Sequence, residues 1–157
     1  MITLNKHAIY QRRINDYLDK QLNLLPKNDA KLLEAMRYGL LIGGKRMRPY
    51  LAYITGKTLG ANLDDIDAIA ASLECIHAYS LIHDDLPAMD DDDIRHNQPA
   101  CHKQFGEAQA ILSGDGLQAL AFEILTNDDS LSAQVRITLL QALTHAAFEM
   151  AEGQSID

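Results

Sequence analysis

Apolar residues recur every three to four positions along most of the 157-residue chain, which is the period of an α-helix. The first such stretch includes Ile9 and is expected to end near Pro26, because a proline ring removes a backbone hydrogen-bond donor. A second helix is expected between a cap at Asp29 and a stop at Gly43 and Gly44. Its apolar face consists of Leu32, Leu33, Met36, Leu40 and Leu41.

Two more helices are expected to lead into the most acidic part of the chain. Pro49 suits the first turn of a third helix, which should end at Gly60. A fourth helix, rich in Ala and Ile, is expected from about Leu63 to the carboxylates that begin at Asp84.

The second half of the chain has the composition of closely packed helices. After a loop at 95–99, a helix is expected over about 103–125, and it contains Gly106, Gly114 and Gly116. Small side chains at this density indicate that the helix lies in close contact with its neighbours.

A last helix is expected from a cap at Ser130 or Ser132 to Gly153. No segment shows the sustained alternation that is typical of a β-strand. We therefore predict an all-α bundle that forms a single domain over residues 1–157. An apolar content of 47% is enough to bury one core.

Composition limits the cellular compartment and the kinds of binding partner that we expect. A formal net charge of −8 argues against nucleic acid as a partner, because the phosphate backbone would be repelled. The first twenty residues contain no apolar run long enough for a signal peptide or a membrane span. Cys75 and Cys101 are too few for a disulfide framework, so we expect a soluble protein of the reducing cytoplasm.

Six carboxylates lie close together at Asp84, Asp85 and 90–93, directly after an apolar stretch. Such charges beside a buried helix face repel one another and raise each other's pKa, unless cations lie between them. The pattern favours a magnesium site. An acidic helix end that projects into water is the alternative.

Pro87 decides whether two of these carboxylates can share an ion. On an ideal helix Asp84 and Asp90 would point about 120° apart. The proline is expected to end or bulge the helix between Leu86 and Met89, which could bring the two side chains together. Magnesium at such sites usually keeps water and substrate phosphate as further ligands, so a phosphorylated ligand is expected.

A basic turn precedes the third helix. Lys45, Arg46 and Arg48 follow the two glycines just before a helix N-terminus, which is an arrangement that binds anions, although a solvated basic turn has the same composition. His77 lies two helical turns before Asp84 and therefore on about the same face.

Together these motifs resemble the trans-isoprenyl diphosphate synthases, in particular their bacterial farnesyl-producing branch. The resemblance rests on the segments 43–49 and 77–90, and the family's usual run continues through 101–115. It covers almost the whole chain and implies the N-terminal half of an isoprenoid synthase-type helical bundle.

The resemblance also implies roles for individual residues. Asp84 and Asp90 match the ligands of Mg²⁺ (Mn²⁺ is possible), with Asp85 assisting, and Arg95 matches the arginine that grips the allylic diphosphate. The residues that match the isopentenyl diphosphate site are Lys45, Arg48 and His77. The implied reaction is a head-to-tail condensation by a homodimeric enzyme.

Two local positions bear on specificity within the family. Tyr79 lies five residues before the first aspartate, where a bulky side chain floors the pocket for the growing tail. Together with the two-residue insertion before Asp90, it matches synthases that stop at fifteen carbons, while C10 and C20 products stay open. His96 stands where the family generally has an arginine, so a fixed charge for isopentenyl diphosphate is replaced by a titratable imidazole.

The chain departs from the family in length, since the resemblance is still continuing at Asp157 and the family's second aspartate-rich motif is missing. We therefore expect a fragment with little or no synthase activity. One alternative is a non-catalytic helical subunit that dimerises through the Ala/Gly-rich helix expected over 103–125 and modulates a full-length synthase. The other is an HD-type metal phosphohydrolase that uses His83 and Asp84.

Overall fold

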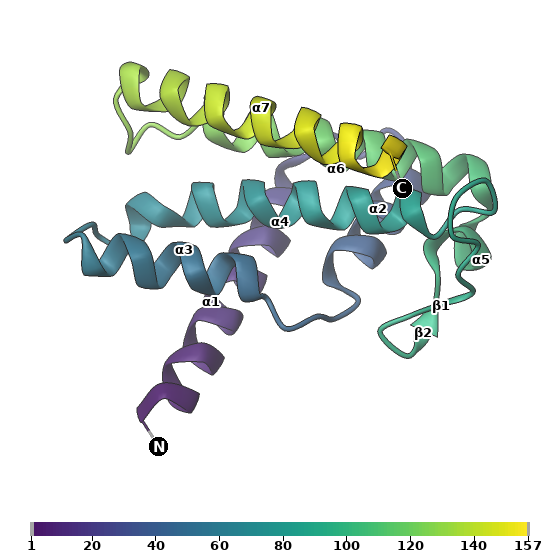
Figure 1. Ribbon diagram of the computed structural model, residues 1–157, viewed down its shortest axis with the longest axis horizontal. Helices are drawn as coiled ribbons and strands as arrows, with labels where there is room; N and C mark the ends of the chain where they lie inside the picture. Colours follow the sequence, from purple (N-terminus) through teal and green to yellow (C-terminus); the bar gives the residue numbers. More distant parts are fainter. Residues whose placement is uncertain (1, 157) are drawn as a thin grey trace.

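The protein is a bundle of helices with one short β-hairpin, seen in a computed structural model that describes residues 2–156 (Figure 1). The elements in chain order are α1 (Ile2–Leu24), α2 (Ala30–Leu41), α3 (Met47–Thr58), α4 (Asp64–Asp84), β1 (Ile94–Arg95), β2 (Gln98–Pro99), α5 (Cys101–Phe105), α6 (Glu107–Thr126) and α7 (Ala133–Ile156). The prediction of an all-α bundle is confirmed.

Two of the expected helix caps are present. The Asp29 carboxylate accepts hydrogen bonds from the amides of Lys31 and Leu32 at 3.0 and 3.1 Å, so it satisfies donors at the start of α2. Ser132 accepts from the amide of Val135 at 3.3 Å and begins α7. The expected stop at Gly153 was wrong, because α7 continues to Ile156.

Three other boundaries differ from the prediction. The expected helix over 103–125 is two helices, because Gly106 adopts a φ of +89° that an α-helix does not allow. α3 begins two residues before Pro49, and the preceding Arg46 is left-handed with a φ of +50°. Part of the expected loop at 95–99 forms the antiparallel hairpin, which extends back to Ile94.

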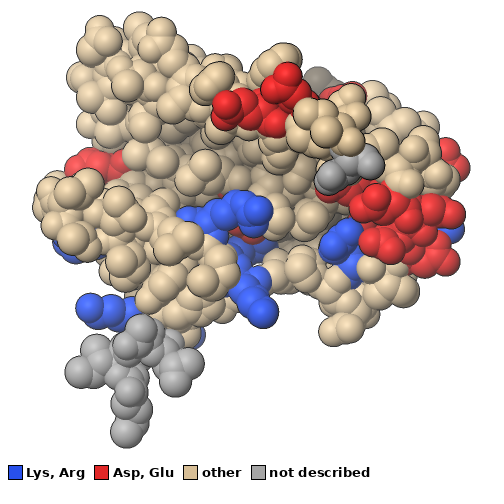
Figure 2. All heavy atoms as spheres, viewed as in Figure 1, with Lys and Arg blue, Asp and Glu red and all other residues tan. Residues whose placement is uncertain are grey.

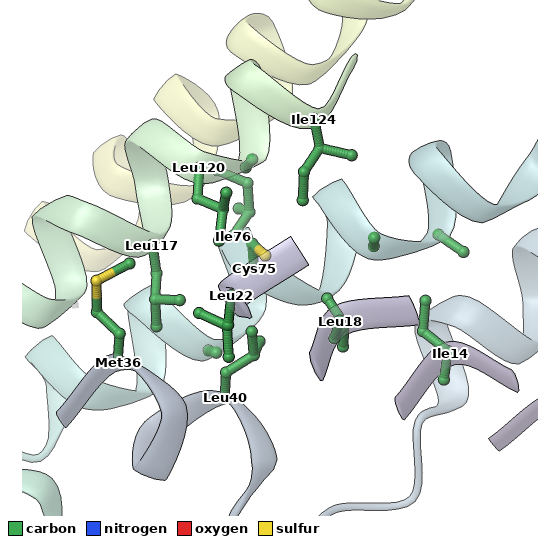
Figure 3. Close-up of a cluster of buried hydrophobic side chains, with 14 of the residues drawn as sticks. Ile14, Leu18, Leu22, Met36, Leu40, Cys75, Ile76, Leu117, Leu120 and Ile124 are labelled. Carbon is green, nitrogen blue, oxygen red and sulfur yellow. The ribbon is translucent and has the colours of Figure 1, made fainter. Parts of the chain in front are cut away.

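The core lies between α4 and the helices around it. In Figure 1, α4 runs between α3 on one side and α6 and α7 on the other. Figure 3 shows apolar side chains of α1, α2, α4 and α6 converging there. The labelled residues are Ile14, Leu18, Leu22, Met36, Leu40, Cys75, Ile76, Leu117, Leu120 and Ile124. Because α4 is central, its two ends and its faces are held in fixed positions.

Small residues of α6 allow its backbone to approach α4 and α2, as predicted. A Cβ atom at Gly114 would collide with the ring of His83 on α4. One at Gly116 would lie 2.9 Å from the sulfur of Met36 on α2. These contacts set the distance between α6 and the helix that carries the acidic residues.

Within residues 2–156, no helix combines the length and the apolar character that crossing a bilayer requires.

We expect Gly114→Ala to lower the free energy of unfolding by about 1–3 kcal/mol, because the added methyl group overpacks the contact with His83. Gly153→Ala is the matched control: it lies on α7 with nothing within 4 Å of the added Cβ, and it should be neutral or stabilising. Urea unfolding followed by circular dichroism measures both. Equal effects of the two substitutions would contradict the close approach of α6 to α4.

Candidate active site

The acidic segment folds back on the end of α4. The helix ends at Asp84, and Pro87 lies in the turn that follows. The amide of Asp90 then donates a hydrogen bond of 2.8 Å to the carbonyl of Asp84, and the amide of Met89 donates one of the same length to Leu86. This turn at Pro87 brings the backbone of Asp90 back to that of Asp84.

The electrostatics of this turn favour a bound cation. Partial burial raises the pKa of Asp84, and the negative charges of Asp90 and Asp85 raise it further. Hard carboxylate oxygens are the ligands that Mg²⁺ prefers, and the exposed Asp90 leaves room for water and for a phosphate group. The donor set of Asp84 and Asp90 therefore fits magnesium.

Asp85 has a different position from its neighbour. Its side chain is buried, and it accepts hydrogen bonds from Nε of Arg95 at 3.1 and 3.2 Å and a shorter one from Nη2. The same Nη2 lies 3.5 Å from Asp92. The bond to Asp85 raises the pKa of Arg95, so the guanidinium stays charged and is anchored next to the acidic turn.

A basic pocket of 260 Å³ is lined by the turn that precedes α3, by α4 and by His96 of the hairpin. Lys45, Arg48, His77 and His96 all line it, so the four residues that the sequence assigned to one anion site do meet. Burial and the charge of Arg48 lower the pKa of His77, so its imidazole is neutral near pH 7. Figure 2 shows one group of basic side chains near the middle of this face and a dense group of acidic side chains at its right-hand edge.

Arg46 does not line this pocket as a free cation. Its side chain is buried, and Nη1 lies 2.5 Å from Oε1 of Glu74 on α4. The remaining donors bind Oδ1 of Asn15 at 2.9 Å and the carbonyl of Leu40 at 2.8 Å. Arg46 therefore fixes the turn that carries Lys45 and Arg48, and the local sequence contained no signal for its partners on α1 and α4.

An apolar groove of 630 Å³ begins at the acidic end of α4. Tyr79 and Asp84 both line it, and the Tyr79 ring packs edge-on against His83 with 5.3 Å between centroids. Sequence reasoning missed the residues that α6 and α7 contribute. These are Ile111, Met150, Ala151, Gln154 and Ser155, which lie far from Tyr79 in the chain.

The imidazole of His83 faces α6. Its Nε2 lies 3.0 Å from the carbonyl of Ile111 on α6, and the ring packs against Gly114. An HD-type metal site needs this imidazole beside Asp84 at the ion. The geometry therefore gives the phosphohydrolase interpretation no support.

One helix, α4, thus lines a basic pocket and an apolar groove and ends in a pair of carboxylates. An all-α bundle with these features defines a protein of the isoprenoid synthase class. The polyprenyl synthetase family model matches residues 29–157, and the chain belongs to this family.

Similar sequences and a similar solved structure support this assignment. The chain is 54% identical over 149 residues to a farnesyl diphosphate synthase of Haemophilus influenzae, which covers 94% of the chain and 50% of that protein. It is 49% identical over 150 residues to the farnesyl diphosphate synthase of Escherichia coli, with 93% and 50% covered. The crystal structure of a geranyltransferase from Legionella pneumophila matches with a TM-score of 0.94 at 45% identity, over 99% of this chain and 56% of that one. The chain spans about half the length of the curated relatives it matches.

We expect Glu74→Gln to destabilise the protein by about 3 kcal/mol, because it leaves the buried charge of Arg46 without its counterion. Glu149→Gln is the control, since Glu149 is an exposed acid in a pair with His145 on α7, and it should change stability by less than about 0.5 kcal/mol. Urea unfolding at pH 7 compares the variants. Similar small losses in both would show that the Arg46 pair does not hold the basic turn.

Proposed function

We propose that this chain provides both substrate-binding surfaces and one magnesium-binding carboxylate pair of a prenyltransferase. The reaction condenses isopentenyl diphosphate with dimethylallyl or geranyl diphosphate to farnesyl diphosphate. The observation that carries the proposal is that α4 lines a basic pocket and an apolar groove and ends at Asp84, where the following turn brings the backbone of Asp90 back to that of Asp84. The names of the relatives support it.

The basic pocket is assigned to isopentenyl diphosphate. Lys45 and Arg48 provide fixed positive charges, and His77 can become a third when a diphosphate stabilises its protonated form. His96 lies against the glycine turn, where its ring is 3.4 Å from the position of a Cβ on Gly44. We assign it as a further diphosphate ligand with a titratable charge.

The acidic turn is assigned to the allylic diphosphate and its magnesium. Asp84 and Asp90 would hold Mg²⁺ or Mn²⁺, which when bound neutralises charge on the diphosphate leaving group. Asp85 keeps Arg95 oriented and charged beside that group. Arg95 stabilises the negative charge that develops on the departing diphosphate.

The proposed reaction uses the two sites together. The bond between C1 of the allylic substrate and the diphosphate oxygen breaks, and its electron pair leaves with the diphosphate. The double bond of isopentenyl diphosphate attacks the allylic cation and forms the new 1'-4 carbon bond. A proton is then lost to the released diphosphate. The groove accommodates the apolar tail, and Tyr79 limits the product to fifteen carbons.

We also propose that the chain forms a homodimer, as the resemblance to the family implies. A second apolar groove of 1040 Å³ lies between α3 and the start of α7, where Leu51, Leu59 and Val135 are exposed. This surface favours the second candidate function, a helical subunit that associates with a synthase without turning over substrate. Association without binding of isopentenyl diphosphate would support that alternative.

We expect Lys45→Gln to weaken binding of isopentenyl diphosphate by at least about tenfold, because a charge-assisted contact is lost. Binding should strengthen from pH 8 to pH 6: His77 has a lowered pKa in the free protein, the anion raises it, and binding therefore takes up a proton. Calorimetry of the 157-residue chain measures both effects. Lys57→Gln on α3, outside the pocket, is the control, and equal losses in the two variants would contradict the assignment.

We expect the 157-residue chain by itself to show little or no condensation of isopentenyl diphosphate with geranyl diphosphate. The carboxylates of one acidic turn supply only part of the ligands for the metal ions that neutralise a bound diphosphate. Product formation in the presence of Mg²⁺, followed with labelled isopentenyl diphosphate, checks this. Turnover at the rate of the Escherichia coli relative, measured in parallel, would contradict it.

A further inference from the structure

A group of potential metal ligands lies beside the acidic turn but does not include Asp84 or Asp90. Asp91 and Asp93 follow the turn, and His102 lies in the first turn of α5. One ligand atom of each of the three residues lies within 4.8 Å of the other two. In Figure 2 the acidic side chains at the edge of the molecule form a dense patch in this region.

His102 has no hydrogen-bond partner to explain its burial. His102 is 6% exposed, and neither Nδ1 nor Nε2 forms a hydrogen bond within the described chain. A buried polar group without a partner loses its hydration without compensation, so such groups normally have a partner. Here a ring nitrogen faces two exposed carboxylates across a space that an ion could fill.

The backbone holds the three residues in this arrangement. The carbonyl of Asp93 accepts a hydrogen bond of 2.8 Å from the amide of Ala100, which directly precedes α5. The amide of Asp91 donates to Leu86 at 3.1 Å, and its φ of +54° turns the chain. The approach of the carboxylates to His102 is therefore a property of the fold of this segment.

The ion pair of Lys103 leaves ligand atoms available. Its Nζ lies 2.7 Å from Oδ1 of Asp93, and Asp91 forms no ion pair with Lys103, so the carboxylate of Asp91 is available to an ion. Ligands around a zinc-sized ion lie about 3.3 Å apart. Asp91 and Asp93 are exposed and can close on an ion, whereas the buried His102 ring fixes its position.

We propose that Asp91, Asp93 and His102 form a second metal site, which binds a divalent transition ion of the Zn²⁺ type and is distinct from the magnesium ligands Asp84 and Asp90. An imidazole with two carboxylates suits Zn²⁺ better than Mg²⁺, which selects oxygen ligands. Three protein ligands leave a coordination position for water. The ion joins the acidic turn to α5 and so closes the loop that carries Arg95 and His96.

The site is tested with Co²⁺ as a spectroscopic probe and Zn²⁺ as a competitor, on the 157-residue chain in excess Mg²⁺. We expect one Co²⁺ per chain with a visible absorption band that Zn²⁺ abolishes. His102→Gln, Asp91→Asn and Asp93→Asn should each weaken Co²⁺ binding by at least about tenfold. Zn²⁺ should also slow amide hydrogen exchange over residues 90–103.

Two controls separate this site from others. The double variant Asp84→Asn/Asp90→Asn should retain the Co²⁺ band, and so should His145→Gln, which removes an exposed histidine paired with Glu149. The proposal is overturned if the double variant loses the band or if no wild-type band forms. It is also overturned if the exposed variants Asp91→Asn and Asp93→Asn, which do not alter the core, bind Co²⁺ as the wild type does.

Discussion

The buried ion pair between Arg46 and Glu74 is the interaction on which the site depends. Desolvating two charges is costly, and the cost is offset only when the remaining donors are also satisfied. Arg46 meets this condition through Asn15 of α1 and the carbonyl of Leu40 at the end of α2, while Glu74 of α4 has one oxygen on Arg46 and the other, Oε2, buried without a hydrogen-bond partner in the described chain. Because Arg46 itself precedes α3, a single guanidinium connects four helices and fixes the basic turn.

The acidic turn favours a bound cation, whereas the basic pocket favours a bound anion. The raised pKa of Asp84 shows that its carboxylate would be stabilised by a cation. Burial and the charge of Arg48 lower the pKa of His77, because both disfavour a further positive charge in the basic pocket. A divalent metal at the acidic turn and a diphosphate in the basic pocket, as proposed above, would supply the missing charge at each place.

The carboxylates after α4 divide into groups with different surroundings. Asp84 and Asp90 meet across the Pro87 turn, Asp85 is buried with Arg95, and Asp91 and Asp93 lie near His102. Adjacent residues of one acidic run therefore differ in burial, partner and expected role. The turn that reverses the chain after α4 produces this division, because successive side chains point in different directions from it.

The sequence by itself determined the helical class, the Asp29 cap and the turn that brings the backbone of Asp90 to Asp84, because periodicity, capping and the effect of Pro87 are local. Matching motifs also identified the family and the residues of the basic pocket. Only the tertiary structure showed that Arg46 is buried rather than available to an anion, and that His83 turns to α6. It alone placed Ile111 and Met150 in the groove and left His102 without a partner. These features depend on contacts between residues that are distant in sequence, and local patterns carry no information about such contacts.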